Sequence, residues 1–153
     1  MKNLLLLALL ATTALTACEK DEPKAKTKTD LLVGKRWRVS AALAFITVGG
    51  QAATQDVLPF QAACSKDDFV TFRADKTLTE DEGPTKCQTT DAQTRAGTWE
   101  LSADQTKLTT TVTGRTAETG TLLELTETTL VVEQQRILPV LGAAKVKVTF
   151  TPF

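Results

Sequence analysis

The residues of this 153-residue chain that could carry chemistry are few. The sequence has no histidine and no tyrosine, and its serines, Ser40, Ser65 and Ser102, have no adjacent base motif. Without histidine, the usual pairs of a nucleophile and its base are unavailable. The acidic clusters Asp67-Asp68 and Glu80-Asp81-Glu82 could form a carboxylate dyad or hold calcium, but their spacing matches no established calcium loop. We interpret them as solvated residues at turns and strand ends, and we predict no catalytic residue, no metal and no cofactor.

The first residues of the chain are typical of a secretory signal. Lys2 supplies a positive charge, the apolar run Leu4–Leu15 follows, and small residues precede Cys18. The run is shorter than the roughly 20 apolar residues that a transmembrane helix needs. Leu15-Thr16-Ala17-Cys18 resembles the lipobox of bacterial lipoproteins, which implies that residues 1–17 are a lipoprotein signal peptide and that Cys18 carries the lipid. The alternatives are an ordinary signal peptide that contains a cysteine and a buried N-terminal helix.

A polar tether is predicted between the lipid anchor and the folded part. Residues 19–30, EKDEPKAKTKTD, lack apolar periodicity and are dense in charge, as flexible linkers are. With the lipidated cysteine they make up the predicted anchor and tether, residues 18–30. The first acidic residues of this segment either belong to a plain linker or, by resemblance to exported lipoproteins, mark the protein for the cell surface. The lipoprotein resemblance implies a location in the bacterial cell envelope, at the outer membrane, with the membrane as a partner.

The other two cysteines enclose a predicted β-hairpin. Cys64 and Cys87 bracket two apolar runs, Phe69–Phe72 and Leu78-Thr79, which lie on either side of a turn. If the first cysteine of the chain carries a lipid, an even pair remains in an oxidising compartment, and we expect a disulfide across the base of the hairpin. The alternatives are two free thiols or a metal site, although two cysteines without histidine make a poor zinc site.

Residues 31–153 are predicted to form one all-β domain. The chain contains 28 threonines, which suit a pleated surface, and stretches such as Leu108–Thr113 and Ala144–Thr151 alternate apolar and polar residues. Turns of similar chemistry, RADKTL, SADQTKL and LTETTL, separate such stretches, and no long helix is indicated. We therefore predict an antiparallel up-and-down meander of about eight strands, whose closure into a barrel removes the exposed edges.

Short motifs in this domain point to a family. They are LVGKRW at residues 32–37, CSKDDFVTF at residues 64–72, GTWEL at residues 97–101 and the later LTETTLVV. They resemble the lipocalin-like domain of small bacterial envelope lipoproteins. The resemblance implies a lipocalin-like, calycin-type β-barrel whose interior can hold an apolar ligand. Two features differ from the usual lipocalin pattern: two residues rather than one separate Gly34 from the following tryptophan, and a strand pattern rather than a helix precedes the end of the chain.

The resemblance also implies a set of residues that contact a ligand. The aromatic and apolar residues expected to contact a small hydrophobic ligand are Trp37, Phe45, Leu58, Phe60, Phe72 and Trp99. Val57, Leu58 and Phe60 would either form a lid over the cavity or pack into the core as a short helical turn. The two tryptophans would serve equally as plugs of the barrel core.

The charge balance argues against some partners. Without residues 1–17, which contain Lys2, 17 basic residues (18 less one) stand against 18 acidic residues, a net charge of −1. No charge excess therefore points to nucleic acid or to a cationic partner. We predict a binding protein that is not an enzyme. The alternatives are a structural or protein-interaction lipoprotein whose barrel is filled by its own side chains and binds no ligand, and a hydrolase that uses the acidic clusters.

Overall fold

The threonine-rich alternating stretches form β-strands in the computed structural model, which describes residues 24–139 and 141–153. The helical elements are α1 (Lys28–Leu32) and two single 3-10 turns, η1 (Leu58–Phe60) and η2 (Ala63–Ser65). Within the described residues, no helix is both long enough and apolar enough to span a bilayer. The strands are β1 (Arg36–Val48), β2 (Gln51–Asp56), β3 (Phe69–Phe72), β4 (Thr77–Asp81), β5 (Thr94–Leu101), β6 (Lys107–Val112), β7 (Glu118–Leu125), β8 (Leu130–Leu138) and β9 (Gly142–Pro152).

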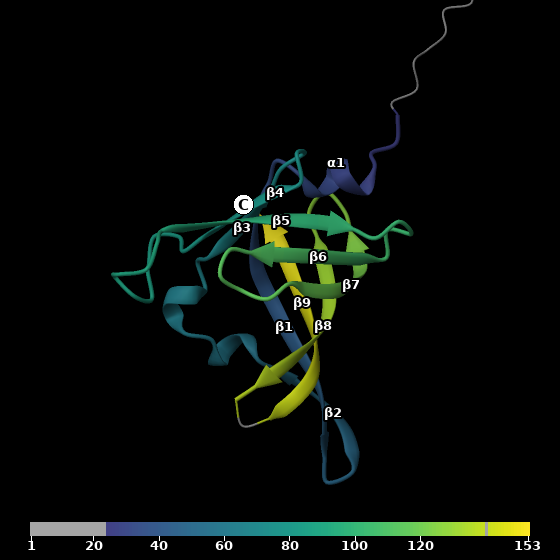
Figure 1. Cartoon of the computed structure of the whole chain (residues 1–153). Helices are drawn as coiled ribbons and strands as arrows, with labels where there is room; N and C mark the ends of the chain where they lie inside the picture. Colours follow the sequence, from purple (N-terminus) through teal and green to yellow (C-terminus); the bar gives the residue numbers. More distant parts are fainter. Residues whose placement is uncertain (1–23, 140) are drawn as a thin grey trace, which may run out of the picture.

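The strands form a single antiparallel sheet that closes into a barrel (Figure 1). From β3 to β9, each strand pairs with the next one along the chain. The first strand then pairs with the last, from Trp37 opposite Pro152 to Phe45 opposite Lys145. The predicted all-β class, antiparallel meander and closed barrel are therefore confirmed. All of these strands and the residues of their core lie within residues 32–152.

Two strands, β2 and β3, share the second position in the barrel. Both run antiparallel to β1 along the same edge, β3 beside Arg36–Arg38 and β2 beside Leu43–Val48. Residues 57–68 interrupt this pairing, and they include Pro59, which has no backbone N–H to donate to a sheet. The nine strands therefore occupy eight positions, and the β1–β2 hairpin projects beyond the rest of the barrel in Figure 1.

Helix α1 closes one end of the barrel. Its N-terminus is capped by Thr27 and Asp30, because the Thr27 hydroxyl accepts from the Asp30 amide while the Asp30 carboxylate accepts from the Thr27 amide. Its last residue, Leu32, is fully buried in the barrel core. The helix begins at Lys28 and so takes up the last three residues of the segment expected to be a tether. The capping pair and the burial of Leu32 together explain why these residues are helical rather than part of the tether.

The three turns of similar chemistry lie at the same end as α1, and two of them bind the helix or the residues that flank it. The Lys28 ammonium donates to the carbonyl of Gln105, in the β5–β6 turn, at 2.7 Å. Lys35 pairs with Glu127, in the β7–β8 turn, at 2.8 Å, and Lys26 pairs with the same carboxylate. Tight turns and a helix thus close this end, whereas the opposite end carries longer connections, at residues 57–68 and 82–93.

The expected disulfide between Cys64 and Cys87 is present. It joins η2 to the loop between β4 and β5, with 5.1 Å between the two Cα atoms. This position is the end of the β3–β4 hairpin that is remote from its turn, so the bridge lies at the end of the barrel opposite α1. It therefore attaches the segment that interrupts the second strand, residues 57–68, to the neighbouring loop.

Replacement of both Cys64 and Cys87 by alanine should lower the free energy of unfolding by about 3 kcal/mol. The physical reason is that the bridge restricts the unfolded chain by joining residues 23 positions apart. Urea unfolding followed by circular dichroism measures the change. An unaltered midpoint with an unaltered m-value would show that the bridge does not stabilise the barrel.

Candidate functional site

Inward-facing apolar side chains fill the closed end of the barrel. Leu32 and Trp37 are fully buried, and Phe72 and Trp99 are nearly so. The indole N–H of Trp37 donates to the Leu32 carbonyl at 2.9 Å, and that of Trp99 donates to the Arg73 carbonyl at 2.9 Å. The rings of Phe72 and Trp99 meet edge to face with 5.8 Å between their centroids. These side chains, which we call the plug, leave no indole N–H unpaired at this end.

Beyond the plug the interior of the barrel is hollow. The cavity has a volume of about 540 Å³. Side chains of residues 57–68 and of the β8 end, among them Gln61, Ser65 and Leu138, line it at the end that carries the disulfide. Apolar side chains from several strands form its floor. The floor residues are Trp37, Phe72, Leu78, Leu108, Leu130 and Val132.

Ion pairs between residues of β4, β5, β7, β8 and the adjoining loops line the wall of this cavity above the floor. Each pair joins an arginine to a glutamate, and all of these side chains face the cavity. The Arg136–Glu118 pair is bidentate, and Arg95 also reaches Asp91 in the β4–β5 loop, at 3.1 Å. The pairs are Arg95–Glu82 at 3.2 Å, Arg115–Glu80 at 2.8 Å and Arg136–Glu118 at 2.7 Å.

Asp68 lines the cavity just before β3 and has no such partner. Its Oδ1 atom is buried and makes no hydrogen bond. Burial, followed by the nearby negative charges of Glu82, Asp67, Glu80 and Asp81, raises the pKa of Asp68 to about 6. The ionised form of this carboxylate is therefore less stable than that of an ordinary aspartate, although it still predominates at pH 7. In the part of the chain that the structure describes, no group of three or more potential ligand side chains is placed to hold a metal ion.

The structure brings together only part of the predicted ligand-contact set. Trp37, Phe72 and Trp99 all belong to the plug. Trp37 and Phe72 also line the cavity floor, whereas Trp99 does not reach the cavity. Leu58 packs outside the cavity, against the apolar cluster around Ala42 and Ala44. Contact with a ligand by Trp37 and Phe72 stays a prediction. Cys18, the predicted lipid-attachment residue, lies outside the described residues, as does the predicted signal peptide.

Phe45 lies on the outer face of the barrel rather than inside it. Strict alternation from Trp37 would place Phe45 on the inner face, but the β1–β9 register shifts between Val39 and Ala41. This bulge adds one residue, so Ala42 and Ala44 face inward and Phe45 is 41% exposed. Phe45 thus does not line the cavity, and its contact with a ligand stays a prediction that this position does not support.

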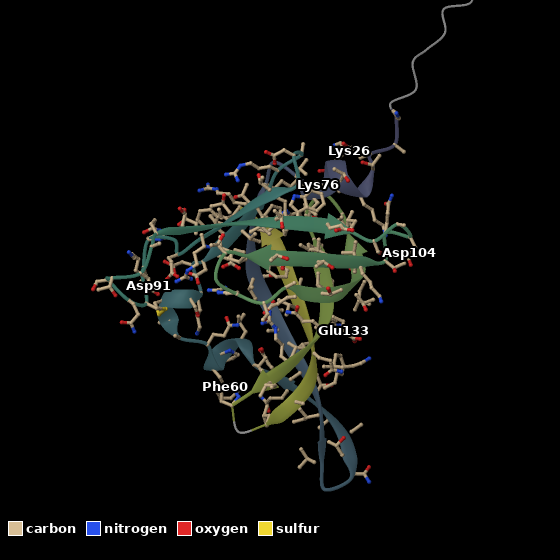
Figure 2. The ribbon with its side chains drawn as sticks, in the orientation of Figure 1. Lys26, Phe60, Lys76, Asp91, Asp104 and Glu133 are labelled. Atoms are coloured by element: carbon tan, nitrogen blue, oxygen red, sulfur yellow. A yellow bond between two sulfur atoms is a disulfide. The ribbon has the colours of Figure 1, made fainter. Side chains whose placement is uncertain are left out.

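The segment considered as a lid forms the short helical turn η1. Val57 lines the cavity and, like Leu58, packs against the apolar cluster around Ala44. Phe60 is 77% exposed and contacts neither the cavity nor that cluster, and Figure 2 marks it at the outside of η1. Val57 and Leu58 thus follow the packing alternative. The predicted ligand contact of Phe60 stays a prediction, which the exposure of its side chain does not support.

Sequence reasoning missed the charged residues of the cavity wall. Glu80 and Glu82 were interpreted as solvated strand-end residues, yet they follow Leu78 at intervals of two and share its inward face. The same interval leads from Val132 to Gln134 and Arg136 on β8. This alternation indicates that the charged side chains face inward. The prediction is difficult to make because charged residues are expected on the outer face of a barrel unless they are paired.

Two comparisons with known proteins found matches. A protein-family model described as a lipocalin-like domain matches residues 32–132, from the end of α1 into β8. Among solved structures, a complex of bovine odorant binding protein with a selenium-containing odorant is similar, with 12% sequence identity and a TM-score of 0.43. That match covers 86% of this chain and 76% of the other. The comparison with curated proteins gave no match.

The substitution Asp68→Asn should raise the free energy of unfolding near neutral pH by about 1 kcal/mol and should change it little near about pH 4. The folded-state pKa of Asp68 lies above the unfolded value of 3.8, so the folded state holds this proton more tightly and loses stability as the pH rises through this range to about 6. We expect less than the full value of the shift because the side chain is partly solvated. Urea unfolding at both pH values measures the effect, and an equal gain at both would contradict this explanation.

Proposed function

The chain belongs to the lipocalin-like domain family, and from this premise we propose that it binds a small, largely hydrophobic molecule inside its barrel. The protein acts in this proposal as a lipid-anchored lipoprotein of the bacterial cell envelope, at the outer membrane. It is a binding protein rather than an enzyme.

The observation that carries the proposal is the hollow interior. Small-molecule sites are usually concave and largely apolar, with a few placed polar groups and volumes of roughly 300–1,000 Å³. The barrel cavity, at about 540 Å³, falls in this range and combines an apolar floor with polar groups in its wall. A barrel filled by its own side chains would leave no such space, so the alternative of a structural lipoprotein is less well supported.

The construction of the two ends of the barrel supports a single entrance. The plug and α1 fill one end, whereas residues 57–68 and the loop that carries Cys87 border the other. The disulfide joins these two segments, which keeps the border of the entrance in place. Ile137 lines the cavity there and is 88% exposed, so apolar surface is accessible to a ligand as it enters.

The direction in which the chain enters the barrel is compatible with anchoring through Cys18. Residues 24–27 lead into α1 at the closed end (Figure 1). Lys26 binds Glu127 there, and Figure 2 shows Lys26 beside α1. A lipid on Cys18 would therefore attach the protein to its membrane through the closed end. The entrance at the opposite end would stay free for a ligand.

The test of ligand binding uses two neighbouring threonines of β6 that face opposite ways. Thr110 lines the cavity, whereas Thr111 is exposed on the outside. We expect Thr110→Phe to weaken binding of N-phenyl-naphthylamine, a neutral apolar dye that fluoresces when shielded from water, by about tenfold or more. Thr111→Phe should leave the affinity within about twofold, because the same side chain is then added outside the barrel.

This comparison uses residues 18–153 with Cys18→Ser, which contain the complete barrel. Fluorescence titration gives the affinities, and urea unfolding verifies that both variants are folded. No binding to the unsubstituted barrel, or equal weakening by the two variants, would argue against a ligand site in the cavity.

The anchor is tested separately by metabolic labelling in a bacterial host. The chain with Cys18→Ser should incorporate no radiolabelled palmitate and should leave the membrane fraction, because the predicted attachment thiol is absent. The chain with Cys64→Ser, which loses a different cysteine and leaves Cys87 as a free thiol, should retain the label. Labelling of the Cys18→Ser chain would contradict the proposed anchor.

A further inference from the structure

We propose that the ligand carries a cationic group, such as an ammonium, at one end of an apolar body, and that Asp68 is its counter-ion. The inference rests on the proposed ligand-binding function and specifies the chemical class of the molecule. Three features of the cavity carry it: the balance of charge in its lining, the lack of a partner for Asp68, and the position of Asp68 relative to the apolar floor.

The charges that line the cavity do not balance. Five carboxylates, those of Asp68, Glu80, Asp81, Glu82 and Glu118, face three guanidinium groups from arginines on β5, β8 and the β6–β7 turn. The difference is two negative charges (five less three). Because the walls of the cavity are less polarisable than water, this excess acts on a ligand more strongly than it would at an open surface. It favours a cation and opposes an anion.

Each arginine of the wall already binds a carboxylate. Arg95, Arg115 and Arg136 each bind a glutamate of the same wall at 2.7–3.2 Å, and the side chains of Arg115 and Arg136 are 53% and 42% exposed. An anion would compete with the glutamate that each arginine already binds, and the excess of negative charge in the lining would oppose it. The arginines therefore favour an acid less than unpaired guanidinium groups would.

Among the described residues that line the cavity, one carboxylate has neither an ion-pair partner nor a hydrogen-bond donor. Glu80, Glu82 and Glu118 are occupied by arginines. Asp81 accepts from the Gly83 amide at 2.9 Å and from the Gln93 side chain at 2.7 Å. Asp68 alone accepts no hydrogen bond, although its Oδ1 atom is buried. A bound ammonium would supply both the missing donor and the missing positive charge.

The position of Asp68 determines the orientation of the ligand in the cavity. Asp68, Val70 and Phe72 are two residues apart and all line the cavity, so they form one inward-facing row from the entrance to the floor. At the rise of an extended chain, this row spans about 13 Å. A cation at Asp68 thus directs the apolar body of the ligand along Val70 towards Phe72 and the plug. A linear amine of about the length of decylamine matches this span.

The raised pKa of Asp68 is consistent with this role. An ionised carboxylate that is partly buried beside other acids costs stability, and a cationic ligand would relieve that cost on binding. Residues retained at such a cost are often functional. The acids around Asp68 come from both neighbouring segments, Asp67 from its own and Glu80, Asp81 and Glu82 from the end of β4.

The test compares three probes that share one chain and differ in their head groups: decylammonium, decanol and decanoate, each below its micellar concentration. Isothermal titration calorimetry at neutral pH uses residues 18–153 with Cys18→Ser. We expect decylammonium to bind about tenfold or more tightly than decanol, and decanoate to bind more weakly than decanol. In the Asp68→Asn variant, decylammonium should lose most of its advantage over decanol while decanol binds as before.

Asp67→Asn is the matched control. It removes the same charge from the adjacent residue, whose Oδ1 atom is likewise buried without a hydrogen-bond partner. The Asp67 carboxylate differs in that its Oδ2 atom accepts from the Thr85 amide at 2.9 Å and that it does not line the cavity. The Asp67→Asn variant should retain the preference for decylammonium. Loss of folding cannot explain the Asp68→Asn result, because we expect that variant to be at least as stable as the unsubstituted protein, which urea unfolding verifies.

The outcomes separate this inference from the function on which it rests. If decanol binds but decylammonium binds no more tightly, or if Asp68→Asn leaves the preference intact, the cationic class of ligand is wrong and the binding function stands. Tighter binding of decanoate than of decanol would likewise overturn the inference. If none of the three probes binds, both the inference and the proposed function are overturned.

Discussion

Backbone hydrogen bonds between β1 and β9 turn an open sheet into a barrel, and the interior depends on that closure. The register runs from Trp37 opposite Pro152 to Phe45 opposite Lys145 with one shift near Ser40. It decides which residues of the longest strand face inward. It also removes the free edges that would otherwise pair with other chains. Without it, the apolar faces of β1 and β9 would have no common interior, and neither the plug nor the cavity would exist.

The interior of the closed barrel has two parts, a packed end that stabilises the fold and a hollow end that is available to a ligand. At the α1 end, tryptophan, phenylalanine and leucine side chains pack densely around satisfied indole N–H groups, which supplies most of the core. At the other end, the wall carries ion pairs and the unpartnered Asp68 around an open space. Hollow space and an unpartnered, partly buried carboxylate both reduce stability, so this end is costly unless a ligand uses it. The disulfide at the same end offsets part of that cost.

Sequence reasoning succeeded where the signal was local. Alternation and turn chemistry predicted the antiparallel meander, and cysteine counting predicted the Cys64–Cys87 bridge. It failed where the outcome depends on pairing between distant segments. The bulge in β1 turns Phe45 outward because of its register with β9, which no local pattern shows. The inward direction of Glu80 could have been read from its spacing to Leu78, but its stability inside the barrel depends on Arg115, 35 residues away.

The central claim is that the barrel encloses a bound small molecule, and native mass spectrometry of the protein made in its own host tests it most directly. The sample is residues 18–153 with Cys18→Ser, purified without detergent. We expect a mass greater than that of the polypeptide with its disulfide formed, which is two hydrogens lighter than the reduced chain. The excess should disappear on denaturation. The released molecule should carry a basic group on an apolar body. A bare polypeptide mass would contradict the account and would favour a barrel that serves without a ligand.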